Sequence, residues 1–233
     1  MVNRITRLIR KYLVKNDIPK KNIIIICYPR TGSTYLLNLL RNHNQISMIK
    51  SYNFFSYLGL KGRRYPMDLL EHGEIIETSP FTYEAILENC NGGDINIEKI
   101  HPEFYNFNTN KFINKIQNEI KKGHEFYFVH CDRDFNDALN SYINYKKRNK
   151  AWHTEVKDLK KYYIASHKSI IDIKNKFGGS YVKFNDLMNH PVKTLSNLYK
   201  EIPFGLKDQG YQATLAVDRF TKDKIPKIFK HGL

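Results

Sequence analysis

The sequence predicts an α/β fold in which a parallel β-sheet is covered by helices on both faces. Short apolar stretches, typical of buried strands, alternate along the chain with longer stretches that have the three-to-four-residue spacing of amphipathic helices. Glycine and proline mark the points where one element ends and the next begins. Strands that alternate with helices favour crossover connections, and therefore a three-layer sandwich with a central parallel sheet.

The first part of the chain contains two expected strands and one helix. Residues 23–28 begin with four isoleucines in a row, which is typical of a strand buried on both faces. The leucine-rich stretch 32–42 follows a turn and has helical spacing. The stretch "GEIIETSP", residues 73–80, predicts a second short strand, because its final proline ends the run.

The middle of the chain continues the alternation. Residues 110–122 have an amphipathic pattern that ends at Gly123, and the apolar stretch 125–131 predicts the next strand. Two further helices are expected over 134–148 and 155–177. A pair of glycines closes the second of these, as is common at helix ends.

The last part supplies one more strand and one more helix. We expect a strand over 180–184 and a helix over 191–202, which has proline in its first turn. Residues 50–72 and 205–233 do not follow the alternation. We expect them to form peripheral loops and short helices on the substrate or cofactor side.

The composition indicates a single domain over residues 1–233. Hydrophobic residues make up 41% of the chain, which is enough for a core. No stretch approaches the length of about 18 apolar residues that predicts a membrane-spanning helix. Residues 1–20 are basic with helical spacing, so we expect a helix on the domain surface, with a membrane-surface role as the alternative.

The three cysteines, Cys27, Cys90 and Cys131, do not have the spacing of metal ligands. Cys27 and Cys131 each end a predicted strand, so we expect small core residues rather than disulfide partners or nucleophiles. This usage favours a reducing compartment, and we expect a cytoplasmic protein.

The formal net charge of +15 suggests an anionic partner. Nucleic acid, an anionic membrane, a nucleotide and an acidic polymer all fit, and a general bias toward Lys, Asn and Ile gives the same charge without any partner. The basic residues are spread along the chain and no nucleic-acid motif is present. We therefore expect no specific nucleic-acid partner.

The stretch "YPRTGSTY" joins the first strand to the first helix and predicts an anion-binding loop. A parallel strand that leads into a helix directs free N–H groups and the positive end of the helix dipole to the sheet's carboxyl edge. Gly32 allows the turn, and Arg30 adds a permanent charge with fork geometry. The Walker A pattern is absent, because no Gly-Lys pair occurs. An incidental arginine on a structural turn is the simpler alternative. The hydroxyl donors of this stretch are Thr31, Ser33 and Thr34.

A second arginine, Arg133, follows the predicted strand 125–131. Ser141 lies eight residues later on the next predicted helix, and two helical turns bring it back toward the same side. An arginine and a hydroxyl placed in this way can hold a second phosphate. The two sites together predict a nucleotide with phosphates at both ends.

With these two motifs in order, the sequence resembles the sulfotransferases that use 3′-phosphoadenosine 5′-phosphosulfate (PAPS) and release 3′-phosphoadenosine 5′-phosphate (PAP). Their first signature, Y-P-[KR]-[ST]-G-[ST]-T, is similar to "YPRTGSTY", and their second is an arginine and a serine with the spacing of Arg133 and Ser141. Residues 181–204 resemble the strand–helix ending of this family. The resemblance covers most of residues 23–204. It implies a P-loop NTPase-like sulfotransferase fold, closer to Golgi-type and bacterial members than to cytosolic ones, and no metal.

The resemblance also implies roles for individual residues. Arg30 would act on the transferring sulfuryl group and offset charge on the leaving phosphate. Tyr35 would stack on adenine in place of a tryptophan, and Phe184 lies where many members have a tyrosine near the adenine. Arg133 and Ser141 would bind the 3′-phosphate. The 5′-phosphate would be bound by Thr31, Gly32, Ser33 and Thr34.

The residue that takes the acceptor's proton is not supplied by either usual motif. Golgi-type and bacterial relatives have a glutamate after the first helix, where this chain has Ser51. Cytosolic members have K-T-H-x-P at the end of their second strand, where we align "ETSP", with Glu77 in the lysine position and Ser79 near the histidine. We expect Glu77 to be the catalytic base, with pairing to a cation as its alternative role. Further candidates are Glu74, His72, His130 and His43.

The predicted function is transfer of a sulfuryl group from PAPS to a hydroxyl or amine of a small-molecule or glycan acceptor. One alternative is a degenerate relative that binds PAPS or PAP without turnover, because the usual base is absent. Another is a P-loop-like nucleotide-binding enzyme that acts on ATP, and a third is a nucleic-acid binder without enzymatic activity. The sequence leaves the acceptor and the oligomeric state open.

Overall fold

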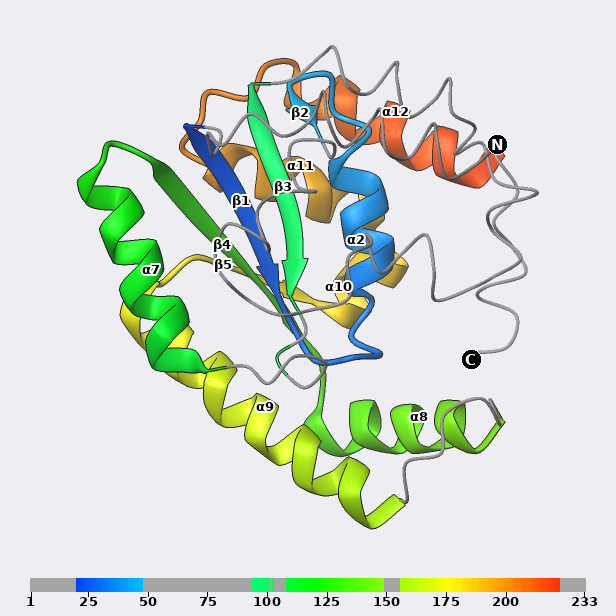
Figure 1. Cartoon of the computed structure of the whole chain (residues 1–233). Helices are drawn as coiled ribbons and strands as arrows, with labels where there is room; N and C mark the ends of the chain where they lie inside the picture. The colour runs from blue at the N-terminus through cyan, green and yellow to red at the C-terminus, as the bar shows by residue number, and fades with distance from the viewer. Residues whose placement is uncertain (1–19, 48–93, 101, 103–107, 149–155, 223–233) are drawn as a thin grey trace, which may run out of the picture.

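The computed structural model describes residues 20–47, 94–100, 102, 108–148 and 156–222. The expected strand over 73–80 and the region 50–72 lie outside these residues, as do Cys90 and all but the last residue of the expected N-terminal helix. Figure 1 draws the described elements in colour and labels them as in the text below.

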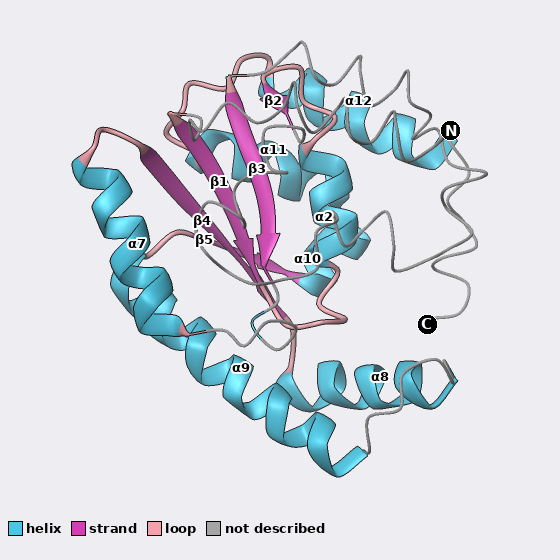
Figure 2. Ribbon diagram, viewed as in Figure 1, coloured by secondary structure: helices cyan, strands magenta, loops and turns pink. Residues whose placement is uncertain are grey.

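The described strands form one parallel sheet (Figure 2). The strand order is β2-β3-β1-β4-β5, and every pair of neighbours runs parallel. The expected parallel sheet is therefore confirmed. Its strands are β1 (Lys21–Ile26), β2 (Ile46–Ser47), β3 (Ile95–Ile100), β4 (Glu125–Asp132) and β5 (Ser180–Lys183).

The expected helices that fall within the described residues are present within one or two residues of their predicted bounds, and two further helices follow β5 and α11. Proline at the first position of α11 and Gly178 directly after α9 mark helix ends as predicted. The helices are α2 (Ser33–Leu40), α7 (Thr109–Lys121), α8 (Phe135–Arg148), α9 (Val156–Phe177), α10 (Phe184–Asn189), α11 (Pro191–Glu201) and α12 (Gln209–Lys222).

Helices cover both faces of this sheet, as Figure 1 shows, and the predicted α/β class is confirmed. The isoleucines of β1 alternate between two cores. Ile23 and Ile25 pack among residues of α2, α11 and α12, whereas Ile24 and Ile26 pack among residues of α7, α8 and α9. A run of isoleucines without polar alternation is thus explained by burial on both faces.

The strand β3 is one that the sequence analysis did not predict. Its sequence, "INIEKI", contains Asn96, Glu98 and Lys99, so it lacks a continuous apolar run. All of its residues are nevertheless buried. It pairs with β1 along its whole length, and its first two residues also pair with β2. Pairing with neighbouring strands, rather than local composition, makes this segment a strand.

The segment 205–233 differs from the expected peripheral loops and short helices over its described part. The helix α12 has 14 residues, packs on α11 and α2, and contributes the fully buried Ala213 and Ala216 to the core. The small alanine side chains leave little apolar periodicity to recognise, although they allow helices to approach closely. The described part of this segment therefore contributes a helix to the core. Phe184, likewise, begins α10 rather than ending the strand.

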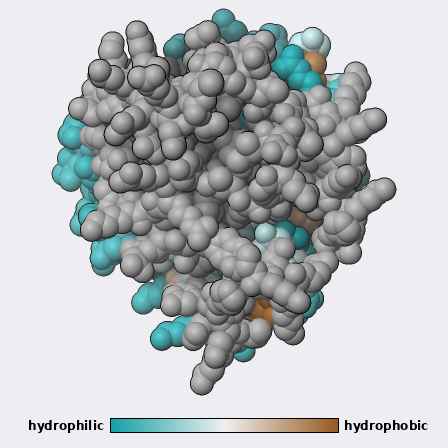
Figure 3. Space-filling view, turned by 45° about the vertical axis from the view of Figure 1, so that its right-hand side comes forward, coloured by the Kyte–Doolittle hydropathy of each residue, from teal (hydrophilic) through white to brown (hydrophobic). Residues whose placement is uncertain are grey.

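Cys27 and Cys131 are buried and are not joined in a disulfide, which confirms the prediction that they are core residues. In the described part of the chain, none of the helices combines the length and apolar character needed to cross a bilayer. Where described residues reach the surface in the view of Figure 3, most of that surface is hydrophilic and the hydrophobic areas are small.

The strand order places β1 at a change of direction in the sheet. From β1 the chain proceeds to β2 and β3 on one side, and then crosses β1 to reach β4 and β5 on the other. In open α/β sheets, ligands bind outside the carboxyl ends of the strands at such a switch point. The loop that follows β1 occupies this place.

Candidate functional site

The loop between β1 and α2 is the first part of the candidate site. Arg30 (φ 69°) and Gly32 (φ 79°) both adopt the left-handed backbone conformation. The turn allows α2 to begin at Ser33, and the Leu36 N–H bonds to the Gly32 carbonyl at 2.9 Å. The first N–H groups of a helix have no intrahelical acceptor, and Gly32 has no side chain to cap them. This helix end is therefore suited to an anion.

Contacts from the loop itself and from α9 hold this turn in place. Thr31 Oγ1 donates to the Tyr28 carbonyl at 2.8 Å, and the Tyr163 hydroxyl donates to the Pro29 carbonyl at 3.2 Å. The Tyr163 ring also stacks on Tyr28, with centroids 4.9 Å apart. These contacts within the protein fix the shape of the loop, and a preformed loop lowers the entropic cost of binding.

The structure brings residues of the two predicted phosphate motifs into contact. Arg30 Nε donates to Ser141 Oγ on α8 in a long hydrogen bond of 3.4 Å, and the Arg30 guanidinium lies 5.0 Å from the Tyr145 ring centroid. Arg133, directly after β4, donates from Nη1 to the Arg30 carbonyl at 2.7 Å. These residues come from separate stretches of the chain and meet where β1 and β4 end.

Phe184 contacts both motifs. The Arg133 guanidinium lies over its ring, 4.2 Å from the centroid. On the side of Gly32, a Cβ added to that glycine would lie 2.9 Å from Phe184 Cδ2. Glycine is therefore favoured at position 32 by the φ angle and by the nearness of this ring.

Lys99 is a cation of the site that the sequence analysis missed. It is the next-to-last residue of β3, is 7% exposed, and donates from Nζ to Thr34 Oγ1 at 2.9 Å. An ammonium group at the positive end of α2 is electrostatically favourable when an anion binds beside it. The signal that could have revealed Lys99 is its place near the end of a strand beside β1, and it was missed because that strand was not predicted.

The remaining loop residues are mostly buried. Thr31 and Ser33 are 1% and 3% exposed, and the Thr31 hydroxyl donates to the Tyr28 carbonyl, so contact of these two residues with a 5′-phosphate stays a prediction. Tyr35 is 9% exposed and packs in the core on the α2 face, where burial raises the pKa of its phenol. Because little of its ring reaches the surface, stacking of Tyr35 on adenine stays a prediction.

The predicted base, Glu77, lies outside the described residues, as does Ser51. The strand that flanks β1 on this side is β3, whose last residues are Lys99 and Ile100, and the chain continues into His101. The sequence Lys99-Ile100-His101 has the lysine-to-histidine spacing of K-T-H-x-P, which we aligned with residues 77–80 in the absence of a predicted β3. His101 is therefore a second candidate for the base, and its placement also lies outside the described residues.

Two other histidines considered for the base are structural. His130 is 3% exposed, and its Nε2 bonds to the Gly178 carbonyl at 2.9 Å. His43 is 1% exposed and accepts the Gln45 N–H at Nδ1, 3.1 Å away, so its Nε2 carries the proton and donates to the Lys207 carbonyl at 3.1 Å. Both rings are engaged by backbone groups.

These histidines make stability depend on pH. Burial lowers the pKa of His43, opposed by the Lys207 carbonyl and by Asp208, and burial likewise lowers the pKa of His130. Folding therefore favours the neutral rings, and the unfolded chain binds more protons between the lowered values and the ordinary value of about 6.5. We expect the free energy of unfolding to rise with pH through this window and to level off above it. Urea unfolding from pH 5 to 8 measures this.

The variant His43→Gln is the control for this pH dependence. Glutamine retains a donor for the Lys207 carbonyl but does not titrate, so the variant should show a shallower rise in stability with pH. An identical slope in both proteins would contradict the assignment to His43.

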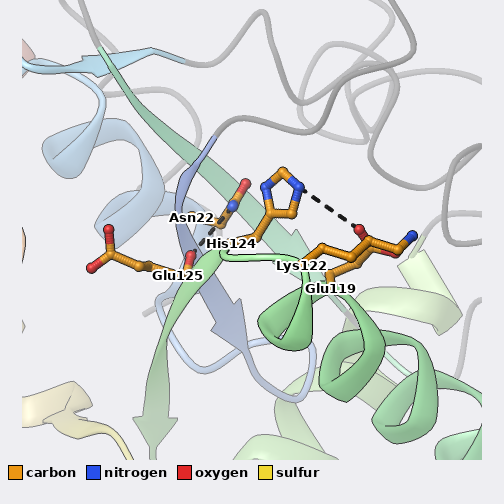
Figure 4. A network of polar contacts seen from close by, with 5 residues as sticks. All are labelled: Asn22, Glu119, Lys122, His124 and Glu125. Atoms are coloured by element: carbon orange, nitrogen blue, oxygen red, sulfur yellow. Dashed lines mark hydrogen bonds and ion pairs between the residues drawn. The ribbon is translucent and has the colours of Figure 1, made fainter.

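A second polar network lies at the opposite, amino-terminal ends of the strands (Figure 4). The fully buried Glu119 pairs with Lys122 Nζ at 3.0 Å and with His124 Nε2 at 3.8 Å, and Asn22 Nδ2 donates to the Glu125 carbonyl at 3.3 Å. These contacts join the end of α7 to the starts of β1 and β4. They stabilise the sheet far from the candidate site.

Among the described residues, His, Cys, Asp and Glu side chains do not gather in groups that could hold a metal ion. No protein-family model matches the chain, and a search of curated proteins gives no match.

Proposed function

We propose that this chain is a PAPS-dependent sulfotransferase that transfers a sulfuryl group to a hydroxyl or amine of a small-molecule or glycan acceptor. The observation that carries this proposal is the meeting of Arg30, Arg133 and Ser141 at the carboxyl ends of β1 and β4, beside the N-terminus of α2. Two arginines, a hydroxyl and a helix N-terminus suit a ligand with two separate anionic groups.

The residues of the site fit the chemistry of sulfuryl transfer. PAPS supplies the activated group, whose bond to a phosphate oxygen breaks as the acceptor oxygen or nitrogen bonds to sulfur and gives its proton to a base. Negative charge then grows on the leaving phosphate. Arg30, Lys99 and the N–H groups of α2 would stabilise this charge, which is commonly a large contribution to catalysis. Glu77 and His101 are the two candidates for the base.

The position of Arg30 is compatible with this role. Its hydrogen bond to Ser141 is 3.4 Å long and joins a cation to a neutral hydroxyl. A phosphate or sulfuryl oxygen forms a stronger, charge-assisted bond to a guanidinium. We therefore propose that Arg30 leaves Ser141 when the nucleotide binds, which also frees the Ser141 hydroxyl for the 3′-phosphate.

Binding of PAP tests the proposal directly. A ligand at a hundred times its Kd stabilises a protein by about 2.7 kcal/mol, which raises the Tm of a chain of this size by roughly 5–10 °C. We expect this shift for the unaltered protein and a much smaller one for Arg30→Ala and Arg133→Ala. Differential scanning fluorimetry with a PAP titration measures it.

The alternatives give different results in the same assay. No stabilisation by PAP, with both arginine variants behaving like the unaltered protein, would refute the proposal. A preference for ATP with Mg²⁺ would favour another class of nucleotide-binding enzyme, and steeply salt-dependent binding to random oligonucleotides without a PAP effect would favour a nucleic-acid binder. Binding of PAP without turnover would favour a degenerate relative. The cytoplasmic location is proposed on cysteine usage alone.

A further inference from the structure

We infer that Phe184 is a positioning residue, which holds Arg133 against the backbone of Arg30 and so sets the shape of the anion loop. The expected effect on PAP binding rests on the proposed function. The contacts of Phe184 and Arg133 from which we argue do not depend on any ligand. Phe184 opens α10, directly after β5, and lies between the two predicted phosphate motifs.

The ring of Phe184 contacts the guanidinium of Arg133. Arg133 Cζ lies 4.2 Å from the centroid of the Phe184 ring. A guanidinium at this distance is attracted to the ring face, and the ring limits the orientations that the side chain can adopt. Gly32 lies against the Cδ2–Cε2 edge of the ring, where a Cβ added to the glycine would be 2.9 Å from Cδ2 and 3.2 Å from Cε2. Phe184 is therefore held between the loop and the arginine.

Arg133 in turn contacts the loop between β1 and α2. Arg133 Nη1 donates to the carbonyl of Arg30 at 2.7 Å, a short bond that carries the charge of the guanidinium. Arg30 has φ 69°, a conformation that costs a non-glycine residue energy and persists only where its surroundings enforce it. The bond to the carbonyl is one enforcing contact, and the Tyr163 bond to Pro29 is another.

Arg133 also has donors left for a ligand. A guanidinium has five N–H donors in a planar fork, and the bond to Arg30 uses one of them. Arg133 can thus position the loop and still offer donors to a phosphate. Phe184 fixes the plane of the fork for both tasks, so a substitution of Phe184 is expected to affect the loop and the nucleotide together.

The test compares Phe184→Leu with Phe184→Tyr. Leucine retains bulk against Gly32 but removes the π face, whereas tyrosine keeps it. We expect Phe184→Leu to speed amide hydrogen exchange over residues 30–35 in the ligand-free protein and to weaken PAP binding by about threefold to tenfold, the range expected for loss of one cation–π contact. Phe184→Tyr should resemble the unaltered protein in both measurements. Tyr211→Leu, at an exposed aromatic residue on α12, is the matched control.

The outcomes separate this inference from the proposed function. If the unaltered protein does not bind PAP, the proposed function fails, while faster exchange in Phe184→Leu alone still supports the positioning role. If amide hydrogen exchange over residues 30–35 is unchanged in Phe184→Leu, the inference is overturned, whether or not the protein binds PAP. Arg133→Lys is the second variant, for use if Phe184→Leu does not fold. It keeps the charge but loses the planar fork, so it should also speed exchange, and an unchanged rate would overturn the inference.

Discussion

Replacing Arg30 by alanine is expected to lower the rate of the proposed sulfuryl transfer by about 10²–10³-fold, the loss typical when one preorganised group that stabilises transition-state charge is removed. Arg30 is the cation of the loop itself and lies at the N-terminus of α2, where charge on the leaving phosphate would develop. Turnover of labelled PAPS with a panel of hydroxyl acceptors measures the rate. Circular dichroism verifies that the variant is folded.

The control for Arg30→Ala removes the same charge at the other end of the same helix. Arg41 is the C-cap of α2, so Arg41→Ala changes the net charge equally without touching the loop. Equal turnover in Arg30→Ala and the unaltered protein would contradict the proposed role. Glu77→Gln and His101→Asn, measured in parallel, identify the base, because only loss of the true base removes the pH dependence that it causes.

The parts of the site that could be predicted from the sequence are those that local chemistry specifies. A buried strand, a glycine turn and a leucine-rich helix follow one another within a short segment, and their order fixes where the helix N-terminus points. Arg133 could be predicted for the same reason, because it directly follows an apolar strand. The contact between Arg30 and Ser141 then results from two adjacent parallel strands ending at the same edge.

The parts that could not be predicted depend on tertiary contacts. The strand β3 contains Asn96, Glu98 and Lys99, so it is recognisable as a strand only from its pairing with β1 and, at Ile95 and Asn96, with β2. Without a predicted β3, Lys99 had no place in the predicted site, and the K-T-H-x-P pattern was compared only with residues 77–80, which lie outside the described residues. Likewise, α12 is recognisable as a core helix only from its packing on α2 and α11.

The variant Gly179→Ala is expected to have the largest effect on stability. Gly179 joins α9 to β5 at φ 114°, and a Cβ at this position would lie 2.1 Å from the Phe128 carbonyl oxygen and 2.8 Å from the carbonyl carbon. Both atoms belong to the backbone of β4, and this backbone cannot shift without disturbing its pairing with β5. We expect a loss of about 4 kcal/mol or more in the free energy of unfolding, a value reached only by severe steric or burial defects. Urea unfolding measures it.

Gly123→Ala separates the steric clash from the strain of a left-handed backbone. Gly123 has a positive φ angle of 90°, as Gly179 also has a positive φ, but nothing lies within 4 Å of a Cβ added to Gly123. We expect this variant to lose only about 1–2 kcal/mol, the cost of the conformation alone. The difference between the two variants is then the energy of the contact with β4. If both lose the same amount, the clash is relieved by small shifts, and the junction between α9 and β5 is more tolerant than the close approach to Phe128 implies.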